Sequence, residues 1–411
     1  MIFRVLFVAA LLLIPSVMRA KPATDDAGFA PKLTIYLARG AANACGPGCD
    51  RWIAVEGKID QDAASRISRF LRNVKDTQRP LYFHSPGGSV EQSFVIGRLL
   101  RRRKAVARVG RTIVTACGAG TQVDDACLKI KTGGGEVEAE IATRHAMCNS
   151  ACSYLFLGAT TREVAPDAVM AVHNSKLTLV LHGHPSPQQI AAFTDHTLAR
   201  ADRERASFIE AMGISHELTD LVSTVKFENM HILTRPELYR FGIDTRSTVE
   251  TAWTLEGASR PFVRTVVLGR KDDGQSFRTM ELRLFCENKD RARLMFVRES
   301  DKGAAGMNSV IMIAGSEKPL IFGKFPARVG TYEVWSETVA PDTMKAMLTA
   351  SHLQMGEGTS LPDGKTSLVT FAVDTNGLDA AWTQILASCP AAPVTGRSVI
   401  ASPALTSGPR Q

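Results

Sequence analysis

The sequence predicts two folded domains, an α/β domain with a mostly parallel sheet and then a smaller, mainly β domain that ends in a helix. The chain has 411 residues, which is more than one ordinary hydrophobic core holds. Between residues 33 and 248, short β-prone runs alternate with apolar stripes at helical spacing. From residue 255 to 391, strand patterns separated by turn residues replace that alternation.

The first domain shows its strand and helix patterns in regular order. The β-prone runs cover 33–37, 51–55, 80–84, 105–109 and 169–172, and the helical patterns cover 59–74, 90–102, 149–157, 187–212, 219–225 and 234–241. Strands that alternate with helices in this way are typical of parallel sheets with right-handed crossovers.

Residues 111–143 interrupt this rhythm with two cysteines, three consecutive glycines and charges of both signs. We expect an inserted loop or hairpin here, which Cys117 and Cys127 could staple. In this position the insertion could cover a functional site or obstruct an interface between subunits.

The second domain reads as a series of short strands. The predicted strands are 262–268, 279–286, 292–296, 309–314, 330–335 and 366–372, followed by a helix over 378–387. Residues 392–411 are rich in Pro, Ser, Gly and Thr, which predicts a flexible tail. This domain carries no catalytic signal, so we expect it to bind a substrate or partner or to stabilise the chain.

The N-terminus has the layout of a secretory signal peptide over residues 1–20. Arg4 precedes an unbroken apolar run from Val5 to Ile14, and Ala20 offers a cleavage point before Lys21. The run is short for a bilayer-spanning helix. A periplasmic or secreted protein is therefore predicted, with an uncleaved N-terminal membrane anchor as the alternative.

Eight cysteines, an even number, fit export to an oxidising compartment. They group as Cys45 with Cys49, Cys117 with Cys127, Cys148 with Cys152, and Cys286 with Cys389. Disulfides are favoured over zinc because no Cys/His pair follows CGPGC at a zinc-finger distance. Pairing of Cys286 with Cys389 is the best-supported assignment, since both lie in the C-terminal region, whereas the two middle pairs could exchange partners.

The formal net charge of +8 is moderately basic. The densest cationic run is Arg101 to Lys104, directly after an apolar helical stretch. Basic side chains at the end of a helix are favoured by the helix dipole, so a solvated helix end explains the run and no nucleic-acid partner is expected.

Three short motifs carry possible chemistry. A strand ends in HSPGGS at 84–89, and such a glycine loop can aim a backbone N–H at an oxyanion, although it is also a common tight turn. Ser150 stands at the predicted start of a helix, where it could serve as a nucleophile or simply cap the helix. His173 follows an apolar strand, so its ring would emerge at the carboxyl edge of a sheet, where sites of parallel α/β folds gather.

In their order and spacing these motifs resemble the crotonase-like superfamily, and within it the proteolytic subunit of Clp protease. The matching blocks are Ser85 to Gly88, Ser150 with Ala151, Val169 to His173, and Leu233 to Gly242, together spanning residues 50–245. The chain looks like an exported bacterial branch of that family.

The resemblance implies a fold, roles and contacts. It implies a ClpP/crotonase-like α/β domain over residues 33–248 with Ser150 as nucleophile and His173 as its base. The Gly88 and Ala151 backbone N–H groups would form the oxyanion hole. The helix at 187–212 matches the region that builds contacts in the family's oligomers, so a homo-oligomer is expected.

The third member of the family's triad, an aspartate, falls here on Met230, which cannot orient a histidine. Glu228 and Asn229 are the nearest polar substitutes, and Asp220 is a more distant one. A Ser-His dyad without a third member is the remaining possibility. Loss of an orienting carboxylate lowers catalysis without necessarily abolishing it.

Two other features could mark sites. Lys176 lies three residues past His173, in no position known for a catalytic lysine. His182 and His184 have no carboxylate at ligand spacing, so a polar loop is favoured over a metal site. No metal and no cofactor are expected.

The sequence therefore predicts an exported serine hydrolase, specifically a peptidase acting on peptides or proteins. The alternative is a non-catalytic binding or assembly protein of the cell envelope on the same scaffold. Acyl-CoA chemistry of the crotonase kind is disfavoured, because it would leave Ser150 without a role and because CoA is an intracellular cofactor.

Overall fold

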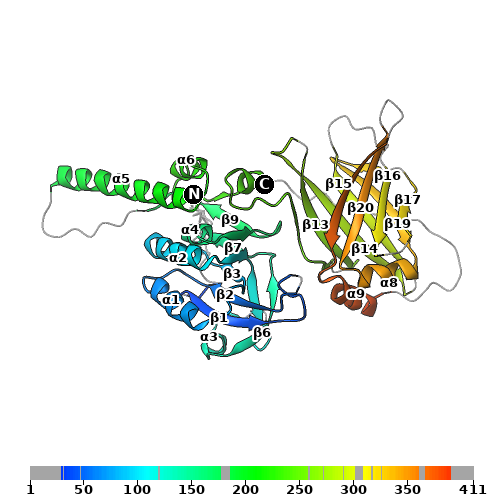
Figure 1. Cartoon of the computed structure of the whole chain (residues 1–411), viewed down its shortest axis with the longest axis horizontal. Coiled ribbons are helices and arrows are strands. Elements are labelled where there is room, and N and C mark those ends of the chain that lie inside the picture. Colours follow the sequence, from blue (N-terminus) through cyan, green and yellow to red (C-terminus); the bar gives the residue numbers. More distant parts are fainter. Residues whose placement is uncertain are drawn as a thin grey trace, which may run out of the picture.

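The computed structural model (Figure 1) describes residues 29–389, except 31, 47, 119–120, 177–185, 258–259, 272, 290, 301–308, 316–317, 325 and 361–365. The predicted signal peptide at 1–20, His182 and His184, and the predicted tail at 392–411 lie outside the described residues.

The first domain is built on a seven-stranded sheet with the order β5-β6-β1-β2-β3-β4-β8. Its strands are β1 (Thr34–Arg39), β2 (Arg51–Glu56), β3 (Leu81–His84), β4 (Val106–Val109), β5 (Arg111–Val114), β6 (Glu136–Ala142) and β8 (Thr161–Glu163). Strands β2, β3, β4 and β8 are mutually parallel, with Ile53 opposite Leu81 and Leu81 opposite Ala107. The predicted α/β class with a largely parallel sheet is thus confirmed.

Two helices, α1 (Ala63–Asn73) and α2 (Val90–Arg103), connect these parallel strands and lie side by side in Figure 1. The apolar stripe of α1 is buried at Ala63, Ala64, Ile67 and Leu71. Ser89 caps the start of α2: its side chain accepts from the Gln92 N–H, which is the ordinary way to satisfy the first turn of a helix.

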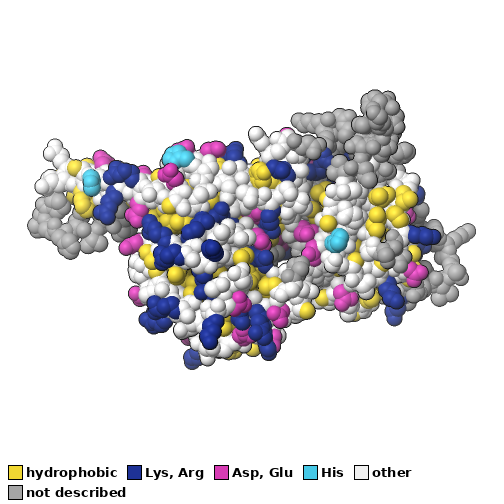
Figure 2. Space-filling view, in the orientation of Figure 1, with side chains coloured by type: hydrophobic (Ala, Val, Ile, Leu, Met, Phe, Trp, Pro, Cys, Tyr) yellow, Lys and Arg dark blue, Asp and Glu magenta, His cyan; other side chains and the backbone are white. Residues whose placement is uncertain are grey.

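The basic side chains at the C-terminal end of α2 are of two kinds, bonded and solvent-exposed. Arg101 donates to the Met212 carbonyl at 2.5 Å, and Arg103 donates to the Leu71 carbonyl at 3.0 Å. Arg102 and Lys104 instead face solvent. Figure 2 shows Lys and Arg side chains gathered over α1 and α2 on this face of the molecule.

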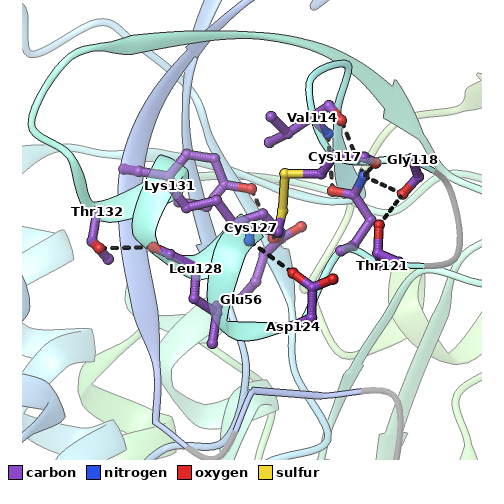
Figure 3. The surroundings of a disulfide bond; sticks show 12 residues. Glu56, Val114, Cys117, Gly118, Thr121, Asp124, Cys127, Leu128, Lys131 and Thr132 are labelled. Carbon is purple, nitrogen blue, oxygen red and sulfur yellow. Dashed lines mark hydrogen bonds and ion pairs between the residues drawn. A yellow bond between two sulfur atoms is a disulfide. The ribbon is translucent and has the colours of Figure 1, made fainter.

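The segment 111–143 is more than the inserted loop or hairpin that we expected. Its strands β5 and β6 form an antiparallel hairpin, and β6 also pairs in parallel with β1, so the segment extends the main sheet. Helix α3 (Asp125–Thr132) lies between them, and a disulfide joins Cys117 to Cys127 (Figure 3). From this helix Lys131 reaches the buried Glu56 at 3.0 Å, which anchors the segment to β2.

A second, three-stranded sheet carries the residues of chemical interest. Its order is β10-β9-β7, with β7 (Met147–Asn149), β9 (Val169–Val172) and β10 (His231–Ile232). Strands β7 and β9 are parallel, with Cys148 opposite Met170. Helix α4 (Ala151–Leu157) follows β7, and all of its residues are buried.

Three more helices complete this domain: α5 (Pro187–Ala211), α6 (Glu217–Thr224) and α7 (Arg235–Arg240). Figure 1 shows α5 projecting from the body of the domain, and its buried residues, Arg205, Phe208 and Ile209, all lie near its C-terminal end. Helix α7 begins with a capping box between Thr234 and Glu237. In the part of the chain that the structure describes, no helix is long and apolar enough to span a bilayer.

Past residue 247 the chain forms two antiparallel sheets with a core of their own. One sheet has the order β11-β13-β14-β15-β19-β18, with β12 on β13, and the other has the order β17-β16-β20-β21. The strands are β11 (Thr248–Glu250), β12 (Thr254–Glu256), β13 (Phe262–Arg270), β14 (Phe277–Asn288), β15 (Arg291–Glu299), β16 (Ser309–Ala314), β17 (Leu320–Phe322), β18 (Ala327–Val329), β19 (Tyr332–Val339), β20 (His352–Ser360) and β21 (Thr366–Asp374).

Two helices, α8 (Pro341–Thr349) and α9 (Leu378–Ala387), pack against these sheets. A disulfide joins Cys286 on β14 to Cys389 after α9. The sequence prediction of α9 coincides with its observed bounds, whereas α8 and β20 were not predicted.

Candidate active site

Ser150 occupies a sharp turn between β7 and α4. Its backbone angles of φ 57° and ψ −124° are unusual for a residue with a side chain and cost conformational energy. Its N–H donates to the Ala171 carbonyl at 2.8 Å, which fixes the turn against β9. Its side chain makes no capping bond to α4. Helix capping, the alternative role for this serine, is therefore not the role that the structure shows.

The Ser150 hydroxyl instead meets His173, which follows β9. Ser150 Oγ and His173 Nε2 are 2.7 Å apart, a hydrogen-bond distance, and His173 as a residue is 7% exposed. The two residues come from the carboxyl ends of the parallel strands β7 and β9, which explains why they meet at one edge of the small sheet.

The other ring nitrogen of His173 settles the direction of the bond to Ser150. His173 Nδ1 lies 2.7 Å from the Phe227 backbone carbonyl, which can only accept a hydrogen bond. The proton of a neutral ring must then sit on Nδ1, so that Nε2 is the acceptor for the Ser150 hydroxyl. This is the tautomer that a general base for serine requires.

The orienting group is thus a main-chain carbonyl and not one of the side chains that we expected. Both ring nitrogens of His173 have other partners, and the side chains of Glu228 and Asn229 are exposed. Met230 is 48% exposed. The carboxylate of Asp220, on α6, lies 3.5 Å from the ring of His216, the residue that precedes that helix. Sequence reasoning missed Phe227 because a backbone oxygen has no residue-type signature.

The glycine loop after β3 packs directly against the Ser150 turn. Gly87 and Gly88 have φ of 106° and 142°, conformations that glycine adopts most easily. A Cβ on Gly87 would lie 2.8 Å from both the Asn149 carbonyl oxygen and Ser150 Cβ. The loop is held by the Ile59 N–H, which donates to the Gly87 carbonyl at 2.8 Å.

Two backbone N–H groups near the hydroxyl have no acceptor among the described residues, those of Gly88 and Ala151. Ala151 is the first residue of α4, where the N–H groups of a helix are left without intrahelical partners and the helix dipole favours negative charge. Gly88 and Ala151 are the residues for which the resemblance implies an oxyanion role, and that role stays a prediction.

His84 ties the glycine loop to the strand that carries Ser150. The Met147 N–H donates to His84 Nδ1 at 3.1 Å, and the Ser85 N–H donates to the Met147 carbonyl at 2.8 Å. Burial lowers the pKa of His84 to about 4, from an ordinary value of 6.5. At neutral pH the ring therefore stays uncharged, and Nδ1 remains an acceptor for this bond.

A cleft of about 940 Å³ opens over Ser150. Its walls include Gly88, Phe94, Lys176 and Phe227. The Lys176 ammonium group lies 5.8 Å from the centroid of the Phe227 ring, within cation–π range. A cleft of this size holds a short peptide segment or another small organic ligand.

The structure contains four disulfides: Cys45–Cys49, Cys117–Cys127, Cys148–Cys152 and Cys286–Cys389. They join the cysteines as the sequence groups them, without exchange between the middle pairs. Four disulfides are compatible with a periplasmic or extracellular location, where oxidised thiols persist. Among the described residues, no three His, Cys, Asp or Glu side chains converge to hold a metal ion.

No protein-family model matches the chain, and no curated protein matches it. Among solved structures, the chain is similar to invasion-associated protein B from Bartonella henselae, with 15% identity, 33% of this chain and 92% of that chain covered, and a TM-score of 0.25. It is also similar to a point mutant of a membrane-bound stomatin-specific protease, 1510-N, with 13% identity, 46% of this chain and 73% of that chain covered, and a TM-score of 0.27. Neither likeness is close enough to bear on function.

Proposed function

We propose that the protein is an exported serine hydrolase, specifically a peptidase, of the ClpP/crotonase-like kind. One observation carries the proposal: the 2.7 Å contact between Ser150 Oγ and His173 Nε2, with His173 held in the basic tautomer by the Phe227 carbonyl. A serine, a base in hydrogen-bond reach, and a third group that orients the base are the recognisable parts of nucleophilic serine catalysis.

In the proposed reaction, Ser150 Oγ attacks the carbonyl carbon of a peptide bond while its proton passes to His173 Nε2. The negative charge on the substrate oxygen would be stabilised by the Gly88 and Ala151 N–H groups. His173 then gives the proton from Nε2 to the leaving amine, and the C–N bond breaks to leave an acyl group on Ser150. A water molecule, deprotonated by His173, releases that acyl group by the same steps in reverse order.

The Phe227 carbonyl would replace one function of the missing carboxylate, the orientation of His173. Where the orienting aspartate of a serine protease is replaced by asparagine, activity falls about 10⁴-fold, mainly because the histidine takes the wrong tautomer. A carbonyl acceptor keeps the proton on Nδ1 and so avoids that loss. It lacks the charge that stabilises the imidazolium, and neutral hydrogen bonds are roughly half as strong as charge-assisted ones. We expect a working but slow enzyme.

The test is labelling by a fluorophosphonate probe, which reacts with activated serines. Wild type is expected to be labelled, and Ser150→Ala and His173→Ala are expected not to be. Ser223→Ala is a matched control, because this exposed hydroxyl only bonds within α6. Absence of Ser150-dependent labelling at neutral pH would rule out the proposal, and casein or peptide cleavage would then separate a peptidase from another hydrolase.

A non-catalytic binding protein is the second candidate. It is favoured by the neutral acceptor on His173 and by the open cleft, since a peptide could occupy the cleft without being cleaved. In that case peptide binding would be unchanged in Ser150→Ala and no product would form.

In either case a homo-oligomer that uses α5 remains a proposal, which sedimentation of wild type against Phe193→Glu would test, because this side chain is 53% exposed on the projecting helix.

A further inference from the structure

The Cys148–Cys152 disulfide encloses the reactive turn. Its cysteines are four positions apart with Cα atoms separated by 5.0 Å, and both are fully buried. The residues between them are Asn149, Ser150 and Ala151. The closed ring therefore contains the proposed nucleophile and one of the two proposed oxyanion donors.

The two ends of this disulfide belong to different elements. Cys148 lies in β7, where it pairs with Met170 on β9 and bridges to Ser85 at the end of β3. Cys152 lies in the first turn of α4. The bond thus fastens the start of a helix to a strand that its neighbours already hold on both sides.

The turn between these ends has an easier alternative conformation. A serine that precedes a helix normally adopts extended backbone angles and bonds its hydroxyl to an N–H of the first turn. Ser150 instead has a positive φ of 57°, and its hydroxyl points to His173. Conformations of this kind persist only where the surroundings enforce them.

We propose that the Cys148–Cys152 disulfide is a positioning element for the proposed reaction. It prevents the turn from relaxing into an ordinary capped helix start, and so keeps Ser150 Oγ against His173 Nε2. The inference rests on the proposed function for its chemical consequence. Its structural part, the conformation of Ser150, can be measured without any reaction.

The chain supplies a matched control in Cys45–Cys49. That disulfide also spans four positions with a Cα separation of 5.0 Å, but it lies in the loop between β1 and β2. Because the entropy that a disulfide removes from the unfolded chain depends on the length of the closed loop, the two bonds restrict the unfolded chain equally. If removal of Cys148–Cys152 lowers reactivity more than removal of Cys45–Cys49, the difference is therefore due to where the disulfide lies in the fold.

The experiment compares three proteins: wild type, the pair Cys148→Ala with Cys152→Ala, and the pair Cys45→Ala with Cys49→Ala. For each, the maximal rate of fluorophosphonate inactivation, the probe concentration at half-maximal rate, and the Tm are measured. Loss of the Cys148–Cys152 bond is expected to lower the maximal rate at least about tenfold. This is the effect of letting one strained residue, Ser150, relax out of its reactive conformation. The half-maximal concentration should stay within about twofold, and the control pair should react within about twofold of wild type.

A crystal structure of the variant that lacks Cys148–Cys152 gives the second readout. We expect Ser150 to leave the positive φ region and its hydroxyl to move out of hydrogen-bond range of His173. If the alanine pair does not fold, Cys148→Val with Cys152→Ala retains more side-chain volume in the core and replaces it.

The possible outcomes separate the two proposals. An unlabelled wild type removes the proposed function, while the crystal structure still decides whether the disulfide positions Ser150. A variant that keeps Ser150 at φ near 57° and in contact with His173 overturns the inference. So does a labelled wild type whose rate the variant matches, or a control pair that loses as much reactivity.

Discussion

Substitution of Gly87 by alanine tests whether the glycine loop sets the geometry of the Ser150 turn. The loop lies so close to the turn that a methyl group at Gly87 would meet the Asn149 oxygen and Ser150 Cβ at 2.8 Å. Ordinary contacts of this kind begin near 3.4 Å, so the loop and the turn must separate by about 0.6 Å or more.

The expected effect has two parts that can be measured separately. Holding an alanine at a φ of 106° costs about 1–2 kcal/mol of folding free energy, since this region disfavours any Cβ. Misplacement of reacting groups by about 1 Å can cost roughly 10²-fold in rate, so a shift of this size should slow labelling of Ser150 about tenfold to a hundredfold.

Gly134→Ala is the matched control, because Gly134 also has a positive φ, 89°, but a Cβ there would have no neighbour within 4 Å. Both variants should lose Tm, by about 2–4 °C per kcal/mol for a domain of this size. Only Gly87→Ala should lose fluorophosphonate reactivity. Equal labelling rates for the two variants would refute the argument that the loop positions the turn.

Three further predictions concern the stability of the chain, measured by denaturant unfolding or Tm. Lys131→Met should lower the free energy of unfolding by about 3–5 kcal/mol, because it leaves the buried Glu56 carboxylate without its cation. Adding Glu56→Gln should restore part of that stability, and an unchanged stability in Lys131→Met would contradict this account. Burial lowers the pKa of His84 to about 4, so the unfolded chain binds the proton first, and stability should fall by roughly 1–3 kcal/mol between pH 6.5 and pH 4. His84→Asn, which retains an acceptor but does not titrate, should flatten that part of the pH profile, and an equally steep profile would assign the loss to other groups. Burial and a neighbouring aspartate raise the pKa of Glu250 to about 7. The protonated carboxyl therefore contributes to folding stability fully below pH 4.5, and this contribution is lost as pH rises through 7. Glu250→Gln should be more stable than wild type by about 1–2 kcal/mol at pH 8 and no more stable at pH 4.

Much of the fold could be predicted from the sequence because its local patterns agree with its tertiary contacts. The stripe at 59–74 is the buried face of α1, and the apolar run at 169–172 is β9. Two features were mistaken or missed for physical reasons. Segment 111–143 joins the main sheet through pairing with β1, and strand pairing between distant segments has no local signature. Strand β20 contains Gly356 and Gly358, which weaken a strand pattern even where the strand is central.

Two residues of the candidate site could be predicted from the sequence, and the third group could not. Ser150 and His173 were identified because side-chain chemistry and strand ends can be read from the residues, and the structure brings them within 2.7 Å. The third group could not be predicted from Glu228 or Asn229, since the atom that meets His173 Nδ1 belongs to the backbone. Its position depends on the path of the loop after α6, which residue types alone do not specify.

Because the group that orients His173 is a main-chain carbonyl, the site should respond to mutation in an unusual way. Any amino acid at position 227 supplies the same carbonyl, so replacement of the partly exposed Phe227 should leave the histidine oriented. Alanine at this position would therefore leave the orienting carbonyl in place, whereas Ser150→Ala and His173→Ala each remove the reacting group itself. A one-residue deletion in the turn closed by the Asn229 N–H and the Lys226 carbonyl, 3.0 Å apart, would instead move the carbonyl away. Sensitivity to loop length combined with tolerance of residue type is thus the mutational pattern that this site should show.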